Sequence, residues 1–179
     1  MKKTTTLLFV LCLLTIKLFG QMKQSDMKSQ LVILESPTTF AKMLEPLKGK
    51  VIYIDIMASF CKPCFSELET IKELESYYKM NNIEKLFISL DNPKDTPKCI
   101  KAIESNNIKG YFTSLHSEQE KESSFGGEIL KLFFTDKDGN VNLSIPKYGI
   151  VNKQGVLVVK NAARPSNTDA LKKQLEEWK

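Results

Sequence analysis

The chain has 179 residues, a formal net charge of +5 at pH 7 and an ordinary composition. This length suits a single domain with its own hydrophobic core, so disulfides are not needed as staples. No run of lysines is longer than two residues, which excludes the concentrated basic face that nucleic-acid binding requires.

The first twenty residues have the pattern of a secretory signal. Two lysines follow Met1, an apolar stretch runs from Leu7 to Ile16, and the small residue Gly20 precedes Gln21. The stretch is too short to span a membrane, and Lys17 interrupts it. We therefore expect cleavage after Gly20 and export to the periplasm or cell envelope, with residues 21–179 as the mature domain. The alternative is an uncleaved membrane anchor.

Cleavage changes both the charge and the cysteine count. It removes three lysines and no acidic residue, so the net charge falls to +2. It also removes Cys12, which follows Leu11 where a lipoprotein signal needs a small residue. Cys61, Cys64 and Cys99 remain, which indicates a functional pair and one further thiol rather than a disulfide framework. We expect Cys99 to be a core thiol, and the alternative is a regulatory or accessory redox thiol.

The first half of the mature chain alternates apolar strands with helical patterns. A short apolar run, Leu31–Leu34, precedes a weak helix over Thr39–Leu47. Val51–Met57 is so rich in apolar and β-branched residues that it predicts a strand buried on both faces, at the centre of a sheet. Pro63 suits the first turn of a helix, and apolar residues at helical spacing extend that helix to about Met80.

The second half adds another strand, another helix and a polar segment. Leu86–Leu90 predicts a core strand, and Asp95-Thr96-Pro97 opens a helix that we expect Gly110 to close. A strand, a helix and a second strand in this order predict a parallel pair with a right-handed crossover. The polar stretch between Leu115 and Gly127 predicts an irregular insert.

The C-terminal part predicts a hairpin and a covering helix. Lys147–Asn152 and Val156–Lys160 flank the turn that ends at Gly155, which adds antiparallel strands. Ser166-Asn167 precedes a helix whose apolar side carries Leu171, Leu175 and Trp178. The fold class is therefore α/β, with a central mixed β-sheet flanked by helices.

The segment that carries most chemical information is Cys61-Lys62-Pro63-Cys64. A thiolate is favoured at the N-terminus of a helix and beside a cation such as Lys62. The spacing alone fits half a zinc site, a structural disulfide or a redox pair. A zinc site from the pair, Cys99 and His116 lacks a second closely spaced ligand pair, so we expect no metal.

Two segments carry a resemblance to a known family. The stretch from Gly49 to Cys64 has a strand, an acidic residue, an aromatic residue and a CxPC motif in that order, and Ser144-Ile145-Pro146 comes just before the hairpin. The chain resembles exported thioredoxin-like thiol-disulfide oxidoreductases of the TlpA/ResA group. The resemblance implies a thioredoxin-like fold over about Leu31–Lys179, with a cis peptide bond before Pro146 that faces the cysteine pair.

The resemblance also implies roles for three residues. Cys61 is the exposed nucleophile, and Cys64, one turn further along and more buried, resolves the mixed disulfide. Asp55, inside an otherwise apolar strand, is the general base for Cys64, and burial should raise its pKa. The alternative for Asp55 is a solvated position at a strand edge.

Substrate contacts are expected from five residues around the pair: Phe60, Lys62, Pro63, Ile145 and Pro146. Phe60 and Ile145 would form an apolar rim, and the backbone of Ile145 would pair with an extended substrate strand.

The leading expectation is a monomer that reduces disulfides of envelope or periplasmic proteins, without a cofactor, and that a membrane electron donor re-reduces. Lys62 replaces a glycine that is common in the family, and Met57 replaces a tryptophan, which leaves the direction of electron flow open. The alternatives are a disulfide oxidase or isomerase of the same fold, and a redox-inactive binding module with a static disulfide.

Overall fold

Six strands form one mixed sheet in the order β1-β4-β3-β2-β5-β6. The structure is a computed structural model that describes residues 31–35, 37–115 and 125–179. The pairs β1–β4, β4–β3 and β3–β2 are parallel, whereas β5 and β6 add antiparallel neighbours beyond β2. The strands are β1 (Leu31–Ile33), β2 (Val51–Met57), β3 (Ile83–Ser89), β4 (Gly110–Ser114), β5 (Lys147–Val151) and β6 (Leu157–Val159). The predicted α/β class with a mixed sheet is confirmed.

Strand β2 occupies the position that its composition predicted. All seven of its residues are buried, and it lies between β3 and β5. Its residues alternate between two hydrophobic clusters. Tyr53 and Met57 pack with the cluster that contains Cys64, while Ile54 and Ile56 belong to the cluster on the other face. Asp55 therefore points to the same face of the sheet as Cys64.

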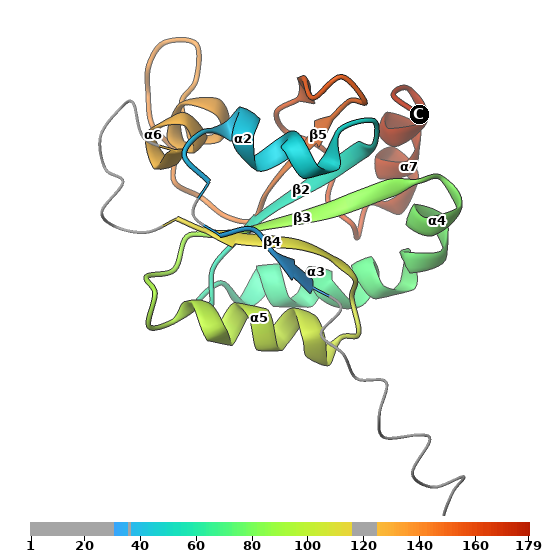
Figure 1. Cartoon of the computed structure of the whole chain (residues 1–179), viewed down its shortest axis with the longest axis horizontal. Coiled ribbons are helices and arrows are strands. Elements are labelled where there is room, and N and C mark those ends of the chain that lie inside the picture. Colours follow the sequence, from blue (N-terminus) through green and yellow to red (C-terminus); the bar gives the residue numbers. More distant parts are fainter. Residues whose placement is uncertain (1–30, 36, 116–124) are drawn as a thin grey trace, which may run out of the picture. The chain divides into compact units, whose positions relative to one another are not determined.

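Helices cover both faces of the sheet. Figure 1 shows α3 and α5 on one side and α2 and α6 on the other. Leu171 and Leu175 of the last helix are buried in the cluster of α3 and α5, as their spacing predicted. The helices are α2 (Phe40–Leu44), α3 (Lys62–Glu73), α4 (Glu75–Met80), α5 (Thr96–Ser105), α6 (Phe125–Ile129) and α7 (Thr168–Glu176), with a 3-10 segment η1 (Glu45–Leu47) and a π-helical segment η3 (Leu130–Phe134).

The single helix expected from Pro63 to Met80 is two helices. The chain bends at Leu74, which ends α3 and begins α4. The bend places Tyr78 in the core, where its ring stacks on Tyr53, and it brings Glu75 to within 2.9 Å of the buried ammonium group of Lys85. Tertiary packing thus overrides the local helical pattern.

Two elements differ from the prediction between residues 106 and 134. Gly110 begins strand β4 and does not close a helix, since α5 already ends at Ser105. The latter part of the expected insert is helical, because α6 starts at Phe125. The sequence does not predict α6, because two of its residues are glycines, which have poor helix propensity. In the structure its Phe125 and Ile129 are buried.

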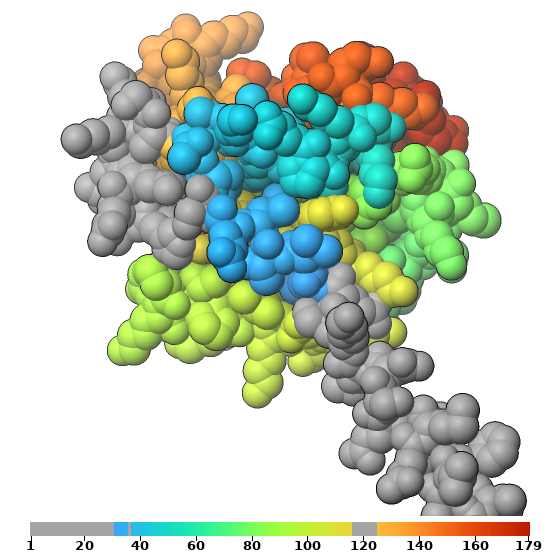
Figure 2. Space-filling model, in the orientation of Figure 1, coloured from blue at the N-terminus to red at the C-terminus, as the bar shows by residue number. Residues whose placement is uncertain are grey.

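Strand β1 forms one edge of the sheet. Figure 2 shows it in blue at the molecular surface beside β4, and the side chains of Val32 and Ile33 are exposed there. The expected signal peptide and His116 lie outside the described residues. Among the helices of the described segments, none is both long and apolar enough to cross a membrane.

Candidate active site

A disulfide joins Cys61 and Cys64 where the chain leaves β2 and enters α3. The Cα atoms are 5.3 Å apart. Cys61 caps the helix, and its Sγ accepts a hydrogen bond of 3.2 Å from the backbone N–H of Cys64. Helix N-termini present unpaired N–H groups and positive potential, so a Cys61 thiolate is stabilised at this position. Cys61 is 5% exposed and Cys64 is fully buried, so Cys61 is the more accessible sulfur but only slightly exposed.

Asp55 is buried in the middle of β2, which excludes the solvated position at a strand edge. Its side chain is 1% exposed, and neither carboxyl oxygen has a hydrogen-bond partner among the described residues. Burial is the largest cause that raises the pKa of Asp55 well above its ordinary value, and the negative charge of Glu67 adds to it. The expected rise in the pKa is confirmed in direction.

Glu67 is a second buried acid near the pair, and the sequence analysis missed it. It lies three residues after Cys64 on the buried side of α3, beside Leu68 and Ile71. Its carboxylate accepts hydrogen bonds of 2.8 Å from both the backbone N–H and the hydroxyl group of Ser166. An acidic residue within the apolar stripe of a helix was the signal that could have identified it.

Buried tyrosine rings share the face of the sheet that carries Asp55. Tyr148 of β5 is directly opposite Asp55 in the register, and its ring stacks on Tyr53 with a centroid distance of 5.5 Å. The hydroxyl groups of Tyr148 and Tyr78 are buried and have no hydrogen-bond partner among the described residues. Burial is the first cause that raises the pKa of both phenols, and the charge of Asp55 is the second.

Pro146 lies at the same end of the sheet as the disulfide. The peptide bond between Ile145 and Pro146 is cis. Strand β5 begins one residue later, with Lys147 opposite Ile56 near the end of β2. The turn to Cys61 leaves from that end of β2, so the register brings Ile145 and Pro146 to the edge that carries the cysteines.

The remaining predicted contacts are on the surface. Phe60 is 76% exposed, and Lys62 and Pro63 are exposed as well, while Ile145 is half-buried. Phe60 also borders an open cleft of about 470 Å³. The cleft continues along mostly apolar side chains, with Asp91, Asn92 and Asp95 as its polar side: Leu90, Leu115, Ile129, Leu130, Phe134 and Leu143.

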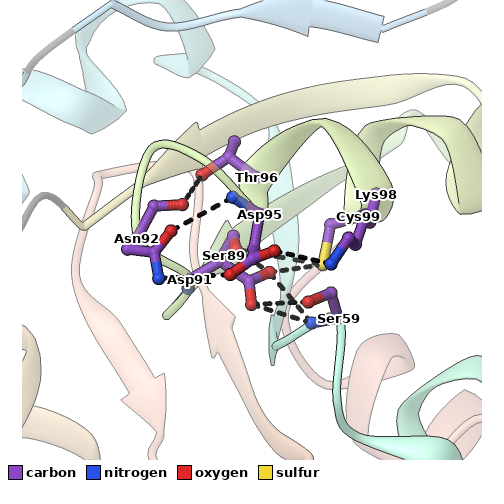
Figure 3. Close-up of polar contacts among 8 residues, drawn as sticks. All are labelled: Ser59, Ser89, Asp91, Asn92, Asp95, Thr96, Lys98 and Cys99. Atoms are coloured by element: carbon purple, nitrogen blue, oxygen red, sulfur yellow. Dashed lines mark hydrogen bonds and ion pairs between the residues drawn. The ribbon is translucent and has the colours of Figure 1, made fainter.

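A polar cluster adjoins the turn that precedes Cys61 and includes Ser59 of that turn (Figure 3). Its centre is the buried carboxylate of Asp91, which accepts hydrogen bonds from Ser59, Ser89 and Cys99. The third cysteine is thus a buried free thiol with a polar partner. The sequence predicted Cys99 as a core thiol, whereas no local pattern indicated Asp91.

The chemistry available here is sulfur chemistry. Within the described part of the chain, no group of three or more histidine, cysteine or acidic side chains is placed to hold a metal ion. The site combines a disulfide at a helix N-terminus with a buried acid of high proton affinity and an exposed aromatic side chain. This arrangement can break and form a disulfide and move the accompanying proton.

Comparisons with known proteins agree with this chemistry. The model of the Redoxin family matches residues 31–176. The chain is 27% identical over 99 residues to the thiol-disulfide oxidoreductase ResA of Bacillus thuringiensis strain Al Hakam. It is 30% identical over 107 residues to ResA of Bacillus cereus strain ATCC 10987. Each match covers 55% of this chain and 56% of the relative, so the chain spans about half the length of these curated relatives.

Solved structures show the same architecture. A solution structure of a protein from Bacteroides vulgatus, assigned as a thiol-disulfide oxidoreductase, has a TM-score of 0.53 and 27% identity over 75% of both chains. A thioredoxin domain from the same organism has a TM-score of 0.54 at 18% identity, over 75% of this chain and 82% of that chain. The second likeness shows the fold alone, and that fold is thioredoxin-like, as expected.

Proposed function

The chain belongs to the Redoxin family, and on this basis we propose that it is a thiol-disulfide oxidoreductase that reduces disulfides of envelope or periplasmic proteins. The observation that carries the proposal is the Cys61–Cys64 disulfide at the start of α3, combined with the buried carboxyl group of Asp55 on the same face of the sheet. Export rests on the signal-like residues 1–20.

The first step uses the reduced protein. The thiolate of Cys61 attacks one sulfur of the client disulfide, the client S–S bond breaks, and one client sulfur leaves as a thiolate that takes up a proton. A mixed disulfide then joins Cys61 to the client. The N-terminus of α3 favours the attacking thiolate, because its backbone N–H groups and the helix dipole stabilise negative charge there.

The second step releases the client. The carboxylate of Asp55 accepts the thiol proton of Cys64, and the Cys64 thiolate attacks the sulfur of Cys61. The mixed disulfide breaks, the second client sulfur leaves as a thiolate that takes up the proton from Asp55, and the Cys61–Cys64 disulfide forms. The client has then gained two electrons and two protons. An upstream dithiol donor at the membrane returns two electrons to the pair for the next cycle.

Client recognition uses the exposed surface around the pair. Phe60 and Ile145 supply the apolar rim, and Lys62, Pro63 and Pro146 complete the contact surface. Ile145 is half-buried and lies just before β5. Its backbone can form main-chain hydrogen bonds with an extended client segment. The mostly apolar cleft beside Phe60 accommodates client side chains that flank the cysteine.

Insulin reduction and client trapping test the proposal. We expect the protein with a dithiol donor to accelerate insulin reduction, and Cys61→Ser to abolish the acceleration. Cys64→Ser should retain clients on Cys61 as mixed disulfides that a reductant releases, with Cys61→Ser/Cys64→Ser as the matched control. Equal acceleration by Cys61→Ser would overturn the catalytic assignment of Cys61, and no acceleration by the wild-type protein would favour a binding module with a static disulfide.

A further inference from the structure

The carboxylate of Asp91 accepts hydrogen bonds from three residues on three different segments. The backbone N–H of Ser59 donates to both oxygens, at 3.1 and 2.9 Å, and the Ser59 hydroxyl donates at 2.9 Å. The Ser89 hydroxyl at the end of β3 donates at 2.8 Å. The thiol of Cys99 on α5 donates at 3.0 Å. Figure 3 shows these side chains converging on Asp91.

This cluster fixes the ionisation of its members. Asp91 is only 3% exposed, and a carboxylate surrounded by donors must act as an acceptor. Burial alone would raise the pKa of Asp91, but the hydrogen bonds from Cys99, Ser89 and Ser59 outweigh it and lower that pKa. Conversely, burial and then the hydrogen bond to Asp91 raise the pKa of Cys99 to about 12. Cys99 is therefore a thiol donor, and thiols attack disulfides only as thiolates.

The cluster is joined directly to the turn that carries Cys61. Ser59 lies two residues before Cys61, and the backbone N–H of Cys61 donates to the carbonyl of Ala58 at 3.0 Å. The backbone N–H of Leu90 donates to the carbonyl of Met57 at 2.9 Å, which ties the start of this turn to the end of β3. Between the residues that make these two backbone bonds lies Ser59. Within the described residues, the side chain that binds Ser59 is that of Asp91.

The charged groups beside the cluster do not replace its hydrogen bonds. One cation that interacts with Asp91 is that of Lys98, whose side chain is largely exposed and pairs with Asp95 at 2.6 Å. Asp95 in turn is hydrogen-bonded to Asn92 in the loop after Asp91. The buried charge of Asp91 is thus stabilised mainly by the two serines and Cys99.

We propose that Asp91 is a positioning residue that holds the turn of Cys61 in place through Ser59, and that Cys99 serves this cluster as a hydrogen-bond donor and takes no part in disulfide exchange. The inference rests on the proposed function for its kinetic consequence only, because the hydrogen bonds between Asp91 and Ser59, which we call the clamp, are a property of the fold.

Two measurements on the reduced protein test it: amide hydrogen exchange at Ser59, Phe60 and Cys61, and the rate at which Cys61 reacts with a small disulfide such as oxidised glutathione. We expect Asp91→Asn to increase exchange at Ser59 and to slow the reaction roughly threefold to tenfold, the range that corresponds to loss of one net hydrogen bond. Asp138→Asn is the control, since it makes the same change at an exposed carboxylate that belongs neither to this cluster nor to the cleft beside Phe60, and it should change neither measurement.

A pair of Cys99 variants separates the possible roles of this thiol. Cys99→Ser keeps a donor and should retain both wild-type measurements, whereas Cys99→Ala removes the donor and should shift both in the direction of Asp91→Asn. Equal loss in both variants would show a redox role for the sulfur, and wild-type behaviour in Cys99→Ala would show that the hydrogen bond is unimportant. Either result overturns the proposal.

The two measurements also separate this inference from the proposed function. Should wild-type protein fail to react with any disulfide while the exchange differences persist, the enzymatic function fails and the clamp stands. If the wild-type protein reacts but Asp91→Asn exchanges at Ser59 at the wild-type rate, the clamp fails alone. A urea unfolding curve for each variant identifies losses that come from global unfolding.

Discussion

Asp55 combines two properties that a proton acceptor for a buried thiol needs. It shares a core face with Cys64, and burial raises its pKa well above that of an exposed aspartate. A carboxylate with a raised pKa is a stronger base, so it matches the thiol of Cys64 better than an ordinary carboxylate would.

We predict that Asp55→Asn slows the resolution of the mixed disulfide by roughly a hundredfold near neutral pH, the lower end of the usual contribution of a general base. The amide keeps the shape of the side chain but cannot accept the thiol proton. The measurement is single-turnover release of a client thiol from a preformed mixed disulfide. An unchanged rate would remove Asp55 from the mechanism while leaving Cys61 and Cys64 in place.

The same variant should change the pH dependence of stability. The pKa of Asp55 is higher in the folded than in the unfolded protein, so the folded state binds more protons between the two values. Stability from this group is therefore greatest below the unfolded pKa, about 4, and falls as the pH rises towards the folded pKa. We expect Asp55→Asn to raise the urea concentration at the midpoint of unfolding relative to wild type at pH 8 and to have less effect at pH 4. A difference between variant and wild type that is the same at pH 4 and pH 8 would contradict the raised pKa of Asp55.

Glu67 should control the pH at which Asp55 becomes an effective base. Its negative charge is the second cause of the raised pKa of Asp55. Glu67→Gln should lower that pKa and move the rising limb of the resolution rate to lower pH. The control is Glu69→Gln, an exposed position on the same helix, which should leave the profile unchanged. A shift of equal size in both variants would indicate a general charge effect.

At the scale of elements, the periodicity of the sequence predicted β2, the start of α3, the hairpin β5–β6 and the buried face of α7. These elements have strong local signals, such as the six apolar positions around Asp55 in β2 and the turn in which the Asn152 side chain accepts hydrogen bonds from Gln154 and Val156. Strand β4 has no such signal, since it is five residues long and begins with glycine.

The reason for Gly110 becomes visible only with the tertiary structure. A Cβ atom at this position would lie 2.7 Å from the carbonyl oxygen of Lys85 on the neighbouring strand. The glycine therefore allows β4 to approach β3 closely. From the sequence alone, the same glycine predicts the end of a helix. Likewise, two of the three residues that donate to Asp91, Cys99 and Ser59, are 8 and 32 residues away in the sequence. Contacts of this kind leave no local pattern.

Gly110→Ala should destabilise the domain by about 2 kcal/mol, as expected for overpacking against backbone that cannot move aside. Gly139→Ala is the control, because Gly139 also has a positive φ of +85° but no atom within 4 Å of an added Cβ. We expect this control to cost less, since it introduces backbone strain without a clash. Urea unfolding measures both, and equal losses would mean that the approach of β4 to β3 is unimportant.

At the scale of the whole molecule, the direction of electron flow is linked to stability. A disulfide that folding stabilises is harder to reduce, so the dithiol form of the protein is a better reductant. Each change of about 30 mV in reduction potential corresponds to about 1.4 kcal/mol of free energy. For a reductase we therefore expect the disulfide form to unfold at a higher urea concentration than the dithiol form. Cys61→Ser/Cys64→Ser should unfold identically with and without reductant. A more stable dithiol form would instead support the oxidase alternative.

The slight exposure of Cys61 determines which molecules can reach it. Because Cys61 is only 5% exposed and the preceding residue, Phe60, is 76% exposed, a small reactant can approach the sulfur more easily than a bulky one. Iodoacetamide should therefore modify the reduced protein much faster than a polymer-linked iodoacetamide of the same reactivity. A client must likewise present its disulfide on an extended, flexible segment, which favours newly exported or unfolded polypeptides over folded ones.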